Sequence, residues 1–166
     1  MVADLQVIFL RFFDNDYQIL RDVKVKDWKD VTNEEVQPRG TTALYDSCGT
    51  IMAQAEKDDA KKTVLVVMTD GYENASKEHT QASIKAKVKE FEDKKWEVVF
   101  LGANFDAVES VSGSVGVVAG KTMNIAAGNL RSAFDTLSTY TTAYASATNA
   151  SINFTEEDKL KATTKV

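Results

Sequence analysis

The feature that most constrains the fold is an apolar, β-branched run that ends in an aspartate. Residues 63–69 read Thr-Val-Leu-Val-Val-Met-Thr, and Asp70 and Gly71 follow them directly. A short run of this composition is typical of a strand buried inside a parallel sheet. Open α/β sheets bind their ligands at the carboxyl ends of such strands. We therefore expect a central strand here, and Asp70 is the first candidate binding residue.

The rest of the chain alternates between strand-like and helix-like patterns. Residues 5–13 and 17–25 read as a β-hairpin around the turn Asp14-Asn15-Asp16, and residues 42–57 have helical spacing. The later elements that we expect are a helix at 80–93, a strand at 96–101, a helix at 105–111, a strand at 116–119 and a helix at 130–144. This order predicts a three-layer α/β fold, with a mostly parallel, doubly wound sheet and an antiparallel N-terminal hairpin at one side.

The length of 166 residues fits a single domain. We place that domain at residues 1–150 and treat residues 151–166 as a charged C-terminal tail. The last dozen residues of this tail are expected to be loose. Ile152 and Phe154 are the two tail residues that could pack against the domain.

Charge and cysteine content exclude some classes of partner. The net charge is −5, from 20 basic and 25 acidic residues, which argues against nucleic acid as a partner. No segment is apolar for long enough to span a membrane, and the N-terminus does not read as a secretory signal. Cys48 is the single cysteine, so no intrachain disulfide can form and a reducing compartment is expected. We interpret Cys48 as a small buried residue, because nothing brings the single histidine, His79, to it as a catalytic partner.

Three polar loops are expected to gather at one edge of the predicted sheet. Gly40-Thr41-Thr42 precedes the first helix, Asp70-Gly71 follows the central strand, and Gly102-Ala103-Asn104 follows the next strand. Their oxygen donors suit a hard cation such as Mg²⁺. The first helix N-terminus offers an alternative, because free N–H groups there can bind a nucleotide or another anion. These loops lack the glycine-rich cradle and the lysine of a phosphate-binding loop.

Several motifs, taken in their order and spacing, resemble the von Willebrand factor A (VWA) domain of the bacterial and phage type. The matching segments are Phe-Asp-Asn-Asp-Tyr at 13–17, Pro-Arg-Gly-Thr-Thr-Ala-Leu-Tyr-Asp at 38–46, Met-Thr-Asp-Gly at 68–71 with Glu-Asn-Ala-Ser at 73–76, Phe-Leu-Gly-Ala-Asn at 100–104, Arg-Ser-Ala-Phe at 131–134 and Tyr-Thr-Thr-Ala-Tyr at 140–144. The resemblance extends from about residue 5 to residue 144. It implies a Rossmann-like sheet and a metal-ion-dependent adhesion site that binds Mg²⁺ or Mn²⁺.

In that family a threonine loop and an aspartate loop hold the cation. The resemblance assigns Thr42 to the threonine position and Asp70 to the aspartate position. Further binding-loop candidates are Gly40, Thr41, Gly71 and Asn104. A partner protein's acidic residue usually completes the coordination of the cation.

The chain departs from the family at its start. It has no Asp-x-Ser-x-Ser loop there, and the first strand and helix of the family would precede residue 5. Most of the usual metal ligands are therefore missing, and Mg²⁺, which takes about six oxygen ligands, is expected to bind only weakly. The missing strand would lie between the hairpin and residues 64–69, and its absence leaves unpaired strand edges. Either the hairpin closes onto that strand, or another chain fills the gap, or the sequence is a piece of a longer one.

We therefore predict a non-enzymatic, VWA-like protein-interaction module with an incomplete metal-ion-dependent adhesion site. A protein partner or self-association into a homo-oligomer would complete it. The alternative is a small-ligand protein that binds a nucleotide or another anion, with phage counter-defence as one setting. A metal-assisted hydrolase is disfavoured, because the chain offers no nucleophile with a nearby general base. The expected location is the cytoplasm of a bacterial or phage-infected cell.

Overall fold

The computed structural model describes residues 7–13, 17–35, 40–58, 61–70, 72–103 and 105–164. The N-terminal hairpin is confirmed: β1 (Val7–Phe13) pairs antiparallel with β2 (Tyr17–Lys24), with a bulge between Leu10 and Arg11. The predicted turn at Asp14 and Asp16 lies outside the described residues. A short 3₁₀ turn, η1 (Val25–Asp27), follows β2.

A separate parallel sheet has the order β3-β4-β5, formed by β3 (Val64–Thr69), β4 (Glu97–Gly102) and β5 (Thr122–Asn124). Every residue of β4 is buried, so β4 is the central strand. Our expectation of a central position for β3 is therefore wrong for the sheet that the structure describes, since β3 is one of its edges. The expectation failed because an apolar run reports burial of the side chains and not pairing of both strand edges.

The last strand also lies later in the chain than expected. Residues 116–119 do not form a strand: Gly116 has a φ of 87°, and Val118 is 53% exposed. A second 3₁₀ turn, η2 (Ala119–Lys121), follows, and pairing with β4 begins where Thr122 meets Phe100. The left-handed backbone at Gly116 turns the chain away from an extended path, which a short apolar run does not reveal.

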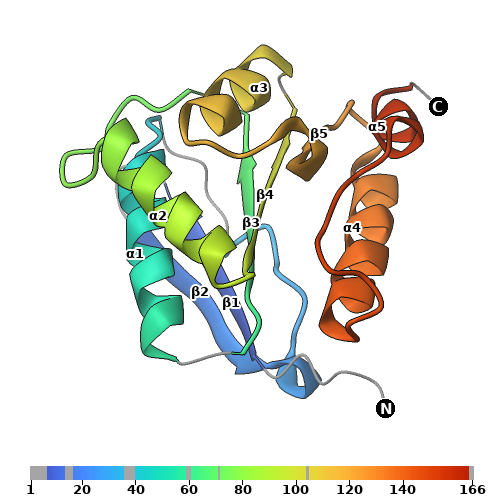
Figure 1. Ribbon diagram of the computed structural model, residues 1–166, viewed down its shortest axis with the longest axis horizontal. Coiled ribbons are helices and arrows are strands. Elements are labelled where there is room, and N and C mark those ends of the chain that lie inside the picture. The colour runs from blue at the N-terminus through green and yellow to red at the C-terminus, as the bar shows by residue number, and fades with distance from the viewer. Residues whose placement is uncertain are drawn as a thin grey trace.

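Helices cover both faces of the sheet, as predicted, and the described residues form five of them where the sequence predicted four. They are α1 (Leu44–Lys57), α2 (Gln81–Asp93), α3 (Phe105–Ser114), α4 (Leu130–Ala145) and α5 (Glu156–Thr163). One hydrophobic core joins α1, α2 and α3 to one face of β3 and β4, and a second joins α4 and α5 to the opposite face of β4 and β5. Figure 1 shows α1 and α2 on one side of β3 and β4, with α4 and α5 on the other. The mixed α/β, layered architecture is therefore as expected.

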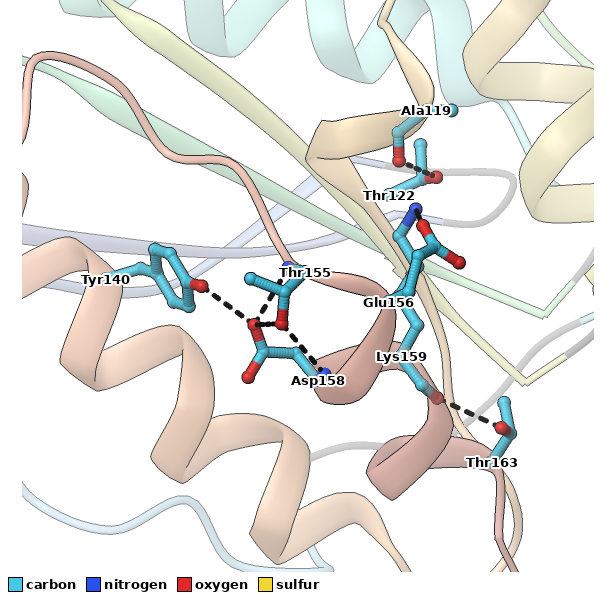
Figure 2. Close-up of polar contacts among 8 residues, drawn as sticks. All are labelled: Ala119, Thr122, Tyr140, Thr155, Glu156, Asp158, Lys159 and Thr163. Carbon is cyan, nitrogen blue, oxygen red and sulfur yellow. Dashed lines mark hydrogen bonds and ion pairs between the residues drawn. The ribbon is translucent and has the colours of Figure 1, made fainter.

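The C-terminal segment is ordered, against the expectation of a loose tail. A capping box starts α5, because the Thr155 hydroxyl accepts from the Asp158 N–H and the Asp158 carboxylate accepts from the Thr155 N–H. The Tyr140 hydroxyl of α4 donates to the same carboxylate at 2.7 Å, as Figure 2 shows. Ile152 is fully buried and Phe154 is 4% exposed. The expectation of a loose tail rested on its many charged residues. The structure shows that Ile152 and Phe154 anchor the segment, while the charged side chains belong to α5, which follows them.

In the part of the chain that the structure describes, no helix is both long enough and apolar enough to cross a membrane.

Candidate functional site

Four of the six predicted site residues lie within the described part of the chain, around the carboxyl end of β3 and the start of α1. Asp70 directly follows the strand and is exposed, while Thr42 is half-buried in the connection that leads to α1. Gly40 and Thr41 precede Thr42 on the same connection and are exposed. The other two candidates, Gly71 and Asn104, lie outside the described residues.

Thr42 is held against the loop that follows Asp70. Its N–H donates to Asn74 Oδ1 at 2.8 Å, and the Asn74 N–H donates to the Thr42 carbonyl at 3.1 Å. Thr42 does not cap α1, because the helix begins at Leu44 and its N-cap is Ala43, which makes no side-chain cap. The structure thus brings the Thr42 backbone and the loop after Asp70 together through Asn74, by one side-chain and one backbone hydrogen bond.

The N-terminus of α1 is capped by the β3–α2 loop instead of by its own sequence. Glu73 Oε2 accepts from the Tyr45 N–H at 2.8 Å, and Ser76 Oγ accepts from the Asp46 N–H at 3.1 Å. The other Glu73 oxygen accepts from the N–H groups of Ala75 and Ser76 at 2.8 and 2.7 Å. Partial burial acts to raise the pKa of Glu73, but these hydrogen bonds outweigh it and lower the pKa.

Asp46 of α1 in turn accepts hydrogen bonds from the backbone of the β3–α2 loop. Its carboxylate accepts from three consecutive N–H groups, those of Lys77, Glu78 and His79, at 2.7, 3.0 and 2.7 Å. Burial acts to raise the pKa of Asp46, and the three N–H donors with the nearby His79 lower it overall. The two acidic residues therefore form a reciprocal clamp between α1 and the loop, here named the α1 clamp (Asp46, Glu73, Asn74 and Ser76).

His79 packs against α1 and is not an exposed surface histidine. A Cβ atom at Gly49 would lie 2.3 Å from His79 Nε2, so only glycine fits beneath the ring. The single cysteine lies in the same helix and is 4% exposed, which confirms it as a buried residue. Burial, followed by the charge of Glu73, raises the pKa of the Cys48 thiol to about 12, so the thiol is not a nucleophile at neutral pH.

The α1 clamp bears on both ligand interpretations. An anion at the α1 N-terminus would compete with the carboxylate of Glu73, which already binds the Tyr45 N–H. For a cation, no group of three or more His, Cys, Asp or Glu side chains lies close enough together within the described ranges. The Asp70 carboxylate and the Thr42 hydroxyl supply two of the roughly six oxygens that Mg²⁺ takes, so these residues alone do not form a complete site.

Sequence reasoning quoted Glu73 and Asp46 only as parts of family motifs. It missed that Glu73 accepts from the backbone of α1 and that Asp46 accepts from the backbone of the loop after β3. A cap that comes from more than twenty residues away leaves no local pattern. The weak helix start was the available signal: the Ala43-Leu44 step has no Ser, Thr, Asp or Asn at the N-cap.

The outer edge of β3 is the second distinctive feature of this region. The Glu97 N–H donates to the Thr63 carbonyl at 2.9 Å, so Thr63 directs its backbone groups toward β4. Backbone groups alternate in direction along a strand, and those of Val64, Val66 and Met68 therefore face away from β4. No other described strand pairs with β3 on that side.

The side chains on this edge are apolar and only partly covered. Val64 and Val66 are half-buried, and Met68 is 41% exposed, whereas Leu65 and Val67 on the opposite face are 8% and 4% exposed. The helices therefore cover one face of β3 more completely than the other. The outer edge and the less covered face meet along the same three residues, Val64, Val66 and Met68, here named the open edge.

Comparison of the chain with protein-family models, curated proteins and solved structures finds no match in any of the three.

Proposed function

We propose that this chain is a non-enzymatic protein-interaction domain whose contact surface is the open edge of β3. The observation that carries the proposal is the outer side of β3, with which no other described strand pairs, in a six-residue apolar strand beside the fully buried β4. The sequence resemblance to the VWA family, whose members bind other proteins, supports the same conclusion.

An edge of this kind favours pairing with another strand. Soluble proteins usually protect long edge strands with lysine, proline or a bulge, and the six residues of β3, Val-Leu-Val-Val-Met-Thr, include neither lysine nor proline. An added strand would pair the N–H and C=O groups of the open edge, and its side chains would cover Met68. Backbone pairing supplies the affinity in such complexes, and pockets for alternate side chains supply the specificity.

A cation has a secondary place in this proposal. Asp70 directly follows β3, and Thr42 is hydrogen-bonded to the loop after Asp70, so a partner that pairs with β3 would bring its own groups close to Asp70. A carboxylate from that partner would add the oxygen ligands that this chain lacks. We therefore expect Mg²⁺ to bind weakly to the chain alone, and only a partner that places a carboxylate beside Asp70 would strengthen that binding.

Binding of nine-residue peptides tests the function. Peptides selected from a displayed random library on the purified chain, and the chain itself at high concentration, should slow amide hydrogen exchange at Val64, Val66 and Met68. Exchange at Leu65 and Val67, which already face β4, serves as the internal control. If neither any selected peptide nor the chain itself slows exchange at the open edge, the proposed function is wrong.

A further inference from the structure

We infer that the open edge is occupied by the same strand of a second copy, with the two β3 strands antiparallel and a two-fold axis at Val66. This inference rests on the proposed function and names its partner. The result would be one continuous six-stranded sheet across a symmetric dimer.

The backbone directions along the open edge match this pairing. Val64, Val66 and Met68 all face outward, and a two-fold axis at Val66 places Val64 of one copy opposite Met68 of the other. In this register each outward residue meets another outward residue, so every facing pair exchanges two hydrogen bonds. A closed two-fold contact also uses the edge completely and leaves none for further growth.

Charge selects this register among its neighbours. With the axis at Val66, Lys62 of each copy lies opposite Asp70 of the other, which gives an opposite-charge pair at both ends. An axis at Val67 would place Asp70 opposite Val64 and Lys62 opposite Tyr72. A parallel arrangement in the same register would place Lys62 opposite Lys62. Opposite charges across a strand pair are stabilising and like charges are destabilising.

The side chains at both ends are available for these pairs. Asp70 is exposed. Lys62 donates to the Tyr144 carbonyl at 2.5 Å, and its Nζ lies 4.6 Å from the centre of the Tyr144 ring. An ammonium group has three N–H donors, so this contact leaves donors for Asp70 of the second copy and also orients Lys62.

The centre of the contact is apolar. Val66 would meet Val66 of the second copy, and Met68, which is 41% exposed in the single chain, would be covered by Val64. A continuous sheet would thus remove apolar surface from water as well as pair the backbone.

A charge-swap series tests the register. Asp70→Lys should weaken dimer formation about tenfold in sedimentation equilibrium, because each end then carries two lysines in contact. Lys62→Asp should weaken it similarly, and the double variant Lys62→Asp/Asp70→Lys should restore it. Asp58→Lys makes the same charge change at the exposed end of α1 and should have no effect. Circular dichroism checks that each variant is folded, and failure of the double variant to recover would contradict the register.

Cross-linking tests the axis independently of charge. Two cysteines introduced by Val66→Cys would have Cα atoms about 5.5 Å apart in the dimer, within reach of a short bismaleimide. Those introduced by Met68→Cys would be about 14 Å apart, because four residues separate them along the strands. The unsubstituted chain is the control for Cys48, which is buried.

The outcomes separate this inference from the proposed function. A dimer that cross-links efficiently at position 66 and poorly at position 68 supports the two-fold axis. A chain that stays monomeric at all concentrations overturns the inference. In that case the selected peptides decide the function separately, since slowed exchange at the open edge would keep the interaction domain and exclude only the second copy.

Discussion

The two edges of the β3-β4-β5 sheet differ in how far other segments of the chain protect them. At the β5 edge the strand has only three residues, and the segments around it are bonded into the fold: Phe154 donates its N–H to Gly120 at 2.7 Å, and Ala126 donates to Ala162 at 2.9 Å. At the β3 edge, six residues extend beside β4, and no described strand covers the outer side. The C-terminal segment therefore closes one edge, and the other remains available.

The regions on either side of the open edge are held by hydrogen bonds between side chains and the backbone. Asn129 reinforces the closed side, because its Nδ2 donates to the carbonyls at the end of α5, those of Lys161, Ala162 and Thr164. The α1 clamp closes the loop beside β3 in a similar way, with carboxylates on backbone N–H groups. Hydrogen bonds of this kind hold both neighbouring regions, so the open edge is a local feature of β3 among the described residues.

Breaking the closed edge should have the largest effect. Phe154→Ala removes a ring that is 4% exposed and stacks edge-on with Tyr140 at 5.4 Å between ring centres. We expect a loss of about 3–5 kcal/mol in the free energy of unfolding, measured in urea. Leu160→Ala, at a residue that is 64% exposed on α5, is the matched control and should change the stability by less than about 0.5 kcal/mol. Equal effects of the two substitutions would contradict the packing of α5.

Removing the Glu73 carboxylate from the α1 clamp should reduce the stability by a smaller amount. Glu73→Ala leaves the N–H groups of Tyr45, Ala75 and Ser76 without their acceptor. Unsatisfied buried donors cost about 1–3 kcal/mol, and we expect a loss of stability in that range. Glu78→Ala, at an exposed residue of the same loop, should have almost no effect. A neutral result for Glu73→Ala would show that the loop does not cap α1.

Acid should lower the free energy of unfolding, because several carboxylates have a lowered pKa in the folded state. Arg21 hydrogen-bonds Glu35, and with the Thr32 N–H it lowers the pKa of Glu35 to about 2. A lowered pKa contributes stability above the unfolded value of 4.5, and this contribution is lost as the pH falls toward 2. Asp46 and Glu73 act in the same direction.

The urea midpoint should therefore decrease between pH 5 and pH 2, and the Glu35 carboxyl should titrate near 2 by NMR. In Glu35→Gln the decrease should be less steep. A Glu35 that titrates at 4.5 would contradict the contact with Arg21.

Addition of Mg²⁺ should have the smallest effect, and it tests whether the chain binds a cation beside the open edge without a partner. We expect no heat of binding in calorimetry at micromolar Mg²⁺, because Thr42 and Asp70 supply too few ligands. Micromolar binding that disappears in Asp70→Ala would show that this chain holds more of a cation site than these two residues.

The sequence predicted the periodic features of this fold and missed the distant contacts. The hairpin, the positions of α1, α2 and α4, and the alternation of strands and helices follow from local hydrophobic spacing. Contacts between residues distant in the chain determine the features that were missed. These features are the cap of α1 by Glu73, the packing of His79 against Gly49 and the ordered position of α5. The apolar run of β3 predicted a central strand and not an edge, because strand pairing is a property of the whole sheet.

The candidate site was predicted only in part. The sequence located Asp70 at the end of a strand, and the structure places it there. The roles given to Thr42 and Asp70 by resemblance remain predictions. The open edge could be expected only from the family pattern, because the backbone direction of Val66 depends on the pairing of Glu97 with Thr63.

Amide hydrogen exchange along β3 at two protein concentrations tests the central claim most directly. At a concentration where the chain is monomeric, Val64, Val66 and Met68 should exchange quickly while Leu65 and Val67 exchange slowly. At high concentration the three outward amides should become slow, while the other two change little. Slow exchange at all five amides in the monomer would contradict the account, because it would mean that the outer edge of β3 is already paired within one chain.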